Sequence, residues 1–334
     1  MQVVVLDDRE EAAYFYSDLV AFTGGKEIGF LPSSYRKGSR DNDSVLARTE
    51  VLSHIRSGDL SVLITYPEAF FERVPEVRVM NEMSMTLKRG DVLSVSFLEE
   101  VLTTYGFKRG DFVYAPGEYA VRGSIVDIYS YAGERPMRVD FFGDEIESIR
   151  FFDIETQLSD SLADLVCIFP DLNAVASSDE YTDLFRWFET SPLWWLRDGR
   201  SIYEKMKSLF ETRSSVFSDP ESLRAYVESS PVVEWGADRL FEGENLDLMT
   251  ESQPPFNKRF DMLADYLGKK REEGYAVYIC ALSEKQFRRL EDIFEDKGYG
   301  VEMSHISGIV HEGFVDEGQK ICLFTEHQIF DRYH

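Results

Sequence analysis

The sequence predicts an α/β protein: a parallel-sheet domain with an inserted antiparallel β-rich domain, followed by a second, small α/β domain. Three observations support this prediction. Strand-like and helix-like segments alternate over the first hundred residues. From residue 111 to 153 the pattern becomes alternating and aromatic, with no long helical stretch. After about residue 171 helical segments return, and a further alternation of helices and strands closes the chain.

The first domain is predicted from short apolar runs that are separated by segments of helical periodicity. Buried strands are expected at residues 3–6, 27–32 and 61–65, and helices at 9–22, 44–55 and from Pro67 onward. This alternation implies parallel strands joined by right-handed crossovers. Later segments predict helices at 181–188, 201–210 and 220–227, a strand at 231–235 and a linker at 242–257. Because the first segment is already a strand, we expect the natural protein to begin earlier.

Three antiparallel strands are expected in the β-rich domain, at residues 119–129, 137–142 and 145–152. Gly143 opens a two-residue turn between the last two, where its tolerance of positive φ suits a type II′ hairpin. Alternate side chains of a strand point to opposite faces. The second strand therefore places Met137, Val139 and Phe141 on an apolar face over a core, and Arg138, Asp140 and Phe142 on the other face.

An arginine and a phenylalanine in one outward row are typical of a protein-binding surface, because a guanidinium and an aromatic ring both contribute strongly when a partner buries them. Arg138 and Phe142 are therefore candidate contact residues. Arg122, in the same row of the preceding strand as Val126, joins them only if the two strands pair in a suitable register, which spacing leaves open. The alternative is that Arg138 and Asp140 merely solvate an exposed face.

The chain is strongly acidic, with 61 Asp and Glu against 36 Lys and Arg and a net charge of −25. DNA binding depends on basic residues that neutralise phosphates, so DNA repels a chain of this charge unless a local basic patch intervenes. The charge fits a module that binds proteins, although solubility alone also explains it. No apolar run predicts a membrane span, and three widely spaced cysteines fit buried, reduced thiols in a cytoplasmic protein.

Motifs for catalysis or metal binding are absent from the sequence. The phosphate-binding pattern G-x-x-x-x-G-K-[ST] fails at residues 24–27, where Glu27 replaces the hydroxyl residue that would reach magnesium. D-D-R-E at residues 7–10 follows a strand, but without a phosphate loop it is interpreted as the acidic start of a helix. His311 and Glu312 lack the second histidine of H-E-x-x-H, because Val315 occupies that position.

The strongest signal lies between residues 117 and 153, which read G-E-Y-A-V-R-G-S-I-V-D-I-Y and then P-M-R-V-D-F-F-G-D-E-I-E-S-I-R-F-F-D. Both segments resemble the second domain of the UvrB/Mfd family, whose pattern they match throughout. Flanking segments favour Mfd over UvrB, among them L-P-S-S-Y-R at 31–36 and Q-P-P-F-N-K at 253–258. The resemblance spans nearly the whole chain and is weakest between residues 171 and 248.

The resemblance implies a domain plan. A degenerate RecA/helicase-like parallel-sheet domain, cut short at its first element, would comprise residues 1–108 and 171–247. The inserted antiparallel β-rich domain, similar to domain 2 of UvrB, would occupy residues 109–170. A small α/β domain of unknown role would follow at residues 250–334. The working phosphate loop of UvrB and its DNA-gripping hairpin have no counterpart in this sequence.

The resemblance also implies a function. Family members similar to Mfd recruit the excision-repair protein UvrA to RNA polymerase stalled at a DNA lesion. The chain would be a non-catalytic N-terminal module of such a factor, and by resemblance Arg122, Arg138 and Phe142 would contact UvrA. RNA polymerase, DNA, ATP and magnesium would bind to later parts of the full-length translocase. This chain is expected to be monomeric and to need no cofactor.

Two other interpretations remain open. The chain is an enzyme fragment if, like UvrB, it binds ATP and damaged DNA, although the missing phosphate loop argues against this. Alternatively, the module is purely structural and holds the rest of the protein until UvrA competes for the same surface. Binding of labelled ATP and DNA separates the first alternative from a docking role.

Overall fold

The computed structural model describes residues 1–25, 27–36, 39–40, 42–133, 135–171, 180–308 and 310–331. The chain divides into two compact units. The first comprises Met1–Ala12 and Glu27–Phe241, and the second comprises Ala13–Lys26 and Glu242–His334. The first unit holds two large hydrophobic cores, one under a parallel sheet and one under an antiparallel sheet. The predicted α/β class with a β-rich insert is thereby confirmed.

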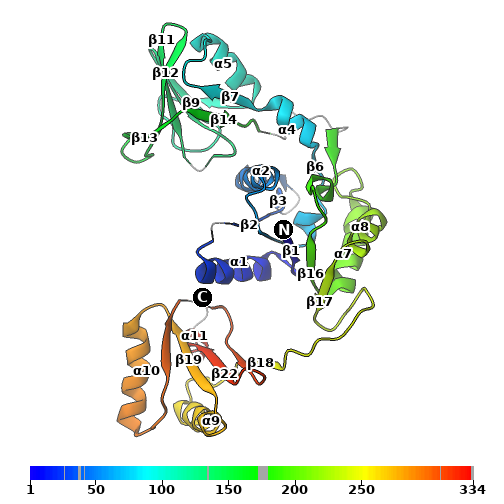
Figure 1. Ribbon diagram of the computed structural model, residues 1–334, viewed down its shortest axis with the longest axis vertical. Helices are drawn as coiled ribbons and strands as arrows, with labels where there is room; N and C mark the ends of the chain where they lie inside the picture. The colour runs from blue at the N-terminus through cyan, green and yellow to red at the C-terminus, as the bar shows by residue number, and fades with distance from the viewer. Residues whose placement is uncertain are drawn as a thin grey trace. The chain divides into compact units, whose positions relative to one another are not determined.

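A five-stranded parallel sheet forms the centre of the first core, in the order β17-β16-β1-β5-β2 (Figure 1). Its strands are β1 (Gln2–Val5), β2 (Ile28–Phe30), β5 (Val62–Thr65), β16 (Leu193–Arg197) and β17 (Val232–Trp235). Strand β1 pairs with β5 on one side and with β16 on the other, so the chain completes this sheet only after the insert. Such short apolar strands suit a sheet that is covered on both faces.

Helices connect these strands, as the alternating pattern predicts. They are α1 (Arg9–Thr23), α2 (Asn42–Ser57), α3 (Pro67–Phe70), α7 (Gly199–Thr212) and α8 (Pro220–Glu228). The helix expected at residues 181–188 is wrong: β15 (Tyr181–Thr182) pairs with β6 (Val74–Pro75), and only a 3-10 turn, η2 (Leu184–Trp187), follows. The indole of Trp187 also donates a hydrogen bond of 2.9 Å to the carbonyl of Pro75 and so ties this segment to β6.

Strands β6 and β15 flank the insert, which α4 (Val77–Met83) precedes. The short hairpin of β3 (Tyr35–Arg36) and β4 (Ser39–Arg40) belongs to the preceding part of the chain.

The insert is built on a six-stranded sheet in the order β13-β12-β11-β10-β9-β8. Its strands are β8 (Lys108–Arg109), β9 (Glu118–Arg122), β10 (Ile125–Tyr129), β11 (Met137–Phe142), β12 (Glu145–Phe152) and β13 (Ser159–Ala163). All neighbours are antiparallel except β8 and β9. The single strand expected at residues 119–129 is wrong, because the chain reverses at Gly123, whose φ of 63° opens a tight turn. Gly143 has a φ of 65° and turns β11 into β12 as predicted.

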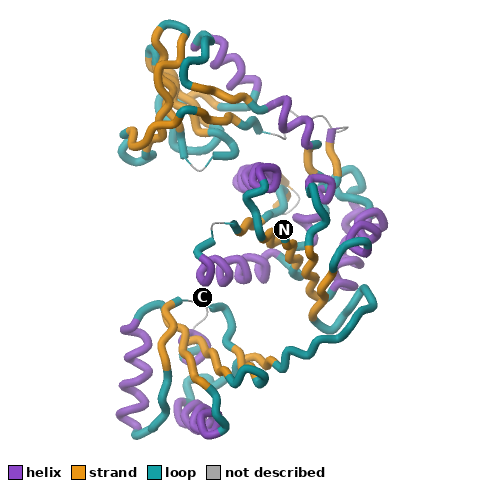
Figure 2. Tube along the Cα trace, in the orientation of Figure 1, coloured by secondary structure: helices purple, strands orange, loops and turns teal. Residues whose placement is uncertain are grey.

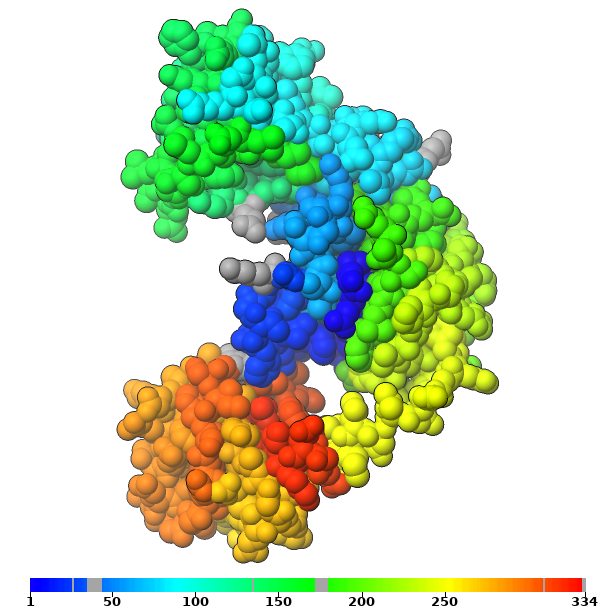
Figure 3. Space-filling model, in the orientation of Figure 1, coloured from blue at the N-terminus to red at the C-terminus, as the bar shows by residue number. Residues whose placement is uncertain are grey.

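The core of this β-rich module begins before the predicted boundary at residue 109. Strand β7 (Met85–Lys88) pairs with β14 (Leu165–Ile168), and helix α5 (Val95–Thr104) covers the sheet (Figure 2). Leu87, Leu98 and Leu102 are fully buried in one cluster with Val126 and Val139. Figure 3 shows these cyan and green segments closely packed in one body. The apolar stripe of α5 indicates that one face of the helix is buried, but not which sheet it covers. The sequence-based boundary at residue 109 therefore assigns these residues to the parallel-sheet domain, whereas they pack in the core of the β-rich module.

The second unit contains a five-stranded mixed sheet in the order β18-β21-β22-β19-β20. Its strands are β18 (Thr250–Ser252), β19 (Ala276–Ala281), β20 (Ser304–Ser307), β21 (Phe314–Asp316) and β22 (Ile321–Thr325), and its helices include α9 (Phe260–Glu272), α10 (Glu284–Lys297) and α11 (Glu326–Ile329). Ser283 and Gln286 form a capping box at the start of α10, as the serine predicts. Across the described ranges, no helix is long and apolar enough to cross a membrane.

Replacing Leu98 by alanine tests the extent of the β-rich module. Its side chain has no exposed surface, so the cavity left behind is expected to cost about 2–5 kcal/mol of unfolding free energy. Hydrogen exchange measured by mass spectrometry should then increase in β9–β12 and stay unchanged in β1, β5 and β16. Leu63→Ala, in β5, is the matched control and should give the reverse pattern. Faster exchange of β1 and β5 in Leu98→Ala would contradict this assignment of α5.

The cysteines give a second prediction, because burial raises the pKa of the Cys280 and Cys322 thiols to about 11. The thiolate is the reactive form, and at pH 8 only about one thiol in a thousand is ionised at such a pKa. Cys167 is only half-buried. Iodoacetamide at pH 8 should therefore modify Cys167 first, and the other two should react faster as the pH rises toward 11. In urea, all three should react alike; earlier modification of Cys280 in the folded chain would refute this.

Candidate protein-docking site

Five side chains form a row across the antiparallel sheet, on the face opposite α5. The register pairs Ala120 with Asp127, Asp127 with Arg138, Arg138 with Arg150, and Arg150 with Leu162. Directly opposed residues of antiparallel strands share a face, with Cβ atoms about 5 Å apart. The row therefore places one acidic, two basic and one large apolar side chain next to one another.

Asp127 is the centre of this face. Its side chain is 0% exposed, and it binds Arg138 through two hydrogen bonds, Nε to Oδ1 at 2.6 Å and Nη2 to Oδ2 at 2.9 Å. Arg122 forms a further ion pair with Oδ2 of the same carboxylate. One buried carboxylate therefore holds two guanidinium groups, an arrangement that we call the Asp127 clamp (Arg122, Asp127 and Arg138). The clamp has a net charge of +1.

Aromatic rings support both arginines of the clamp. The guanidinium of Arg138 lies 4.8 Å from the ring centroid of Phe152, and its Nη1 donates to the carbonyl of Gln157 at 3.2 Å. The hydrogen bonds to Asp127 raise the pKa of Arg138, so this arginine is charged at every physiological pH. Arg122 lies 5.0 Å from the ring centroid of Phe112. These contacts fix the orientation of the guanidinium planes before any partner binds.

The two arginines differ in how much surface they offer. The side chain of Arg122 is 37% exposed, whereas that of Arg138 is 17% exposed. Arg122 is therefore accessible to a partner, whereas most of the Arg138 side chain is covered by the module itself. Arg122 also shares its face with Asp127 rather than with Val126, which lies in the core, because the turn at Gly123 resets the alternation.

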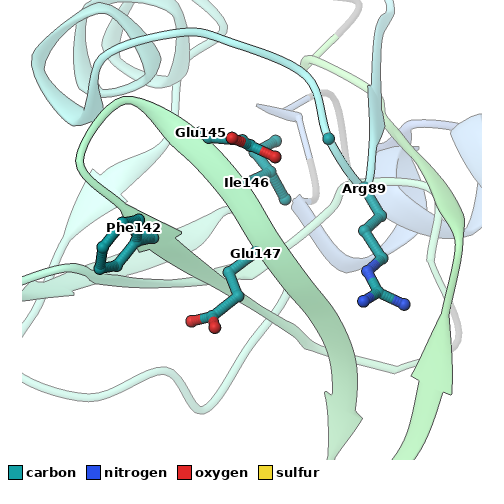
Figure 4. A pocket seen from close by; sticks show the side chains of 6 residues that line it. Arg89, Phe142, Glu145, Ile146 and Glu147 are labelled. Carbon is teal, nitrogen blue, oxygen red and sulfur yellow. The ribbon is translucent and has the colours of Figure 1, made fainter.

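Phe142 lies at the end of the β11–β12 hairpin and is 78% exposed. A β-bulge between Asp140 and Phe141 precedes it, and such bulges redirect side chains at sheet ends. Together with Arg89, Gly90, Glu145, Ile146 and Glu147 it lines a shallow, open hollow (Figure 4). It lies four positions after Arg138, which corresponds to about 13 Å along a strand. The ring is a protruding anchor rather than part of the clamp.

The structure thus brings Arg122 and Arg138 together and leaves Phe142 at the end of the same sheet. Sequence reasoning missed Asp127 and Phe112 as members of this site. The signal that could have identified Asp127 is the Gly123-Ser124 turn: a hairpin there aligns Asp127 with Arg138 and brings Arg122 to the same face. The carboxylate is then the group that two neighbouring cations require.

The carboxyl ends of parallel strands are the other place where α/β proteins bind ligands. There, Nη1 of Arg197, at the end of β16, lies 2.8 Å from Oε2 of Glu11. Nζ of Lys205, in α7, lies 2.8 Å from Oε1 of Glu68. Both cations are paired with carboxylates in this structure. Among the residues that the structure describes, no cluster of histidine, cysteine and carboxylate side chains is arranged to hold a metal ion. The Asp127 clamp and Phe142 therefore form the better-defined candidate site.

Comparison with known proteins identifies the same module. The family model described as the UvrB interaction domain matches residues 85–173. The transcription-repair-coupling factor of Escherichia coli (strain K12) is 27% identical over 211 residues, which cover 61% of this chain and 18% of that protein. That of Bacillus subtilis (strain 168) is 29% identical over 155 residues, 46% of this chain and 12% of the relative. That of Staphylococcus epidermidis (strain ATCC 12228 / FDA PCI 1200) is 34% identical over 112 residues, 34% of this chain and 10% of the relative.

The matched residues extend from β7 to just beyond β14 and agree with the buried core of the β-rich module. The alignments span less than a fifth of the length of these relatives. The resemblance to the UvrB/Mfd family that the sequence indicates is confirmed.

Removing the carboxylate of the clamp should destabilise the module. Asp127→Ala leaves Arg138 largely buried without its counter-charge, and breaking a buried ion pair in this way costs about 3–5 kcal/mol. Arg122→Ala should cost about 1 kcal/mol or less, because Arg122 is partly exposed and Arg138 still neutralises the carboxylate. Urea unfolding, with hydrogen exchange of β9–β12 as the readout of the module, measures both changes in stability. Equal effects of the two substitutions would show that the clamp is not the stabilising unit.

Proposed function

We propose that this chain is a protein-docking module that binds UvrA. The premise is that residues 85–173 match the UvrB interaction domain family and that the chain is similar to transcription-repair-coupling factors. The observation that carries the proposal is the Asp127 clamp on one face of the sheet, with Phe142 exposed at its end. Arginine and aromatic side chains of this kind dominate the energetics of protein interfaces.

Charge supports a protein partner. The chain carries a net charge of −25, whereas the clamp presents a local positive charge. A small basic area on an acidic protein attracts acidic groups at short range, while the whole chain repels the continuous phosphate array of DNA. UvrA would therefore supply carboxylates to Arg122 and the edge of Arg138, and an apolar pocket to Phe142. The Asp127 clamp and the Phe142 ring would together set the orientation of bound UvrA and the affinity for it.

The wider role that we propose is the one that the resemblance to this family implies. In a full-length factor, the module would recruit UvrA to RNA polymerase stalled at a DNA lesion, in the cytoplasm. Polymerase and DNA contacts, and the ATP and magnesium that drive translocation, would belong to parts of the factor outside this chain. The chain itself would act without a cofactor, as a monomer, through binding alone.

Phe142→Ala tests the proposal. Loss of a protruding aromatic anchor should weaken UvrA binding by about 2 kcal/mol, or roughly thirtyfold in Kd, with no loss of stability because the ring is exposed. Isothermal titration calorimetry of the whole chain with purified UvrA measures the change. Phe97→Ala is the matched control: Phe97 is also exposed, but on α5, which covers the opposite face of the sheet. It should bind like the unaltered chain.

The combined variant Arg138→Ala with Phe142→Ala decides the assignment. UvrA affinity equal to that of the unaltered chain would show that this face is not the docking site. Binding of labelled ATP, or retardation of a DNA duplex by the unaltered chain, would favour a UvrB-like helicase fragment instead.

A further inference from the structure

We infer that the docking face continues past the clamp to Arg150 and Leu162, and that this extension receives an acidic side chain of the partner that is bordered by apolar groups. The inference rests on the proposed function and deepens it. It names two further contact residues and the chemistry that each recognises. Both residues stand in the same cross-strand row as Asp127 and Arg138.

Arg150 lies directly opposite Arg138, in the register of β11 and β12. Like charges at directly opposed positions destabilise a sheet. Asp127 relieves this repulsion only on the Arg138 side, because its carboxylate binds Arg138 and Arg122. The chain therefore retains a second arginine at a position where a neutral residue would stabilise the free module. Such an unfavourable local choice is expected where a residue serves binding.

Arg150 has no partner of its own within the described part of the chain. No described residue forms an ion pair or hydrogen bond with its side chain, which is exposed. Asp160, the acidic residue of the neighbouring strand β13, is engaged by Arg135. The guanidinium of Arg150 is thus the uncommitted cation of this row. Its five donors match a carboxylate in a bidentate geometry, which defines the acidic group expected from the partner.

Leu162 supplies the apolar half of the extension. It lies opposite Arg150 on β13, the edge strand of the sheet, and is 77% exposed. Leu158, just before this strand, is also highly exposed. A partner that covers Leu162 removes water from around Arg150, and the attraction between a guanidinium and a carboxylate strengthens as the surroundings become less polar. The two residues therefore act together, with charge selecting the partner and the leucine excluding water.

The experiment measures binding and stability of the same variant, because the inference predicts opposite changes. Arg150→Ala should weaken UvrA binding about tenfold by calorimetry, the effect of one well-placed charged contact. The urea midpoint of the module should stay the same or rise, since a repulsive neighbour of Arg138 is removed. A merely structural arginine would lower the urea midpoint instead. Arg150→Lys should retain part of the affinity, because it keeps the charge but loses the bidentate fork.

Two further variants complete the test. Leu162→Asp places a carboxylate where an acidic partner is expected and should weaken binding more than Leu162→Ala. Arg109→Ala is the control: Arg109 is exposed on β8, the other edge strand, and is paired with Glu99 at 2.8 Å. It should leave UvrA affinity unchanged.

The outcomes separate this inference from the function on which it rests. If Arg150→Ala and Leu162→Asp bind like the unaltered chain while Phe142→Ala loses affinity, the extension is wrong and the docking function stands. If the unaltered chain does not bind UvrA, both the docking function and the extension to Arg150 and Leu162 are wrong. A lower urea midpoint of Arg150→Ala together with unchanged affinity also overturns the extension.

Discussion

The buried carboxylate of Asp127 is the constraint on which the docking face depends. A carboxylate without exposed surface is unfavourable unless hydrogen bonds and counter-charges replace its water. Here those groups come from the two neighbouring strands: Arg122 from β9 and Arg138 from β11. The requirement for both fixes the register of three strands. It also sets two guanidinium groups in defined orientations, so the surface is organised before a partner arrives.

Charge is divided between holding the face together and offering it to a partner. Arg138 binds Asp127 and is mostly buried, whereas Arg122 binds the same carboxylate but stays partly exposed. Arg150 is exposed and forms no ion pair with a described residue. Elsewhere in the first unit, Arg197 and Lys205 are engaged by carboxylates at the carboxyl edge of the parallel sheet. An acidic chain thereby carries a local positive charge on this face, which suits recognition of an acidic protein surface more than of nucleic acid.

The fold class was accessible from sequence because it depends on local signals. Periodicity distinguishes a helix from a strand, and Gly143 marks a turn wherever the strands pair. The errors arose where neighbours far apart in sequence decide the structure. Helix α5 has an apolar stripe, but the strands β9–β12 against which it packs come later in the sequence. Its own pattern therefore does not show which sheet buries it. Tyr181 and Thr182 pair with β6, more than a hundred positions earlier, and this pairing overrides a helical pattern.

For the site, the sequence by itself determined the residue types, the faces on which Arg138 and Phe142 lie, and the family resemblance. Only the tertiary structure decided that Arg122 and Arg138 share Asp127, that Phe142 stands apart at the hairpin end, and that Arg150 faces Arg138. The physical reason is register. Alternation along one strand is a local property, whereas opposition between strands is set by turns, bulges and buried ion pairs that link several segments.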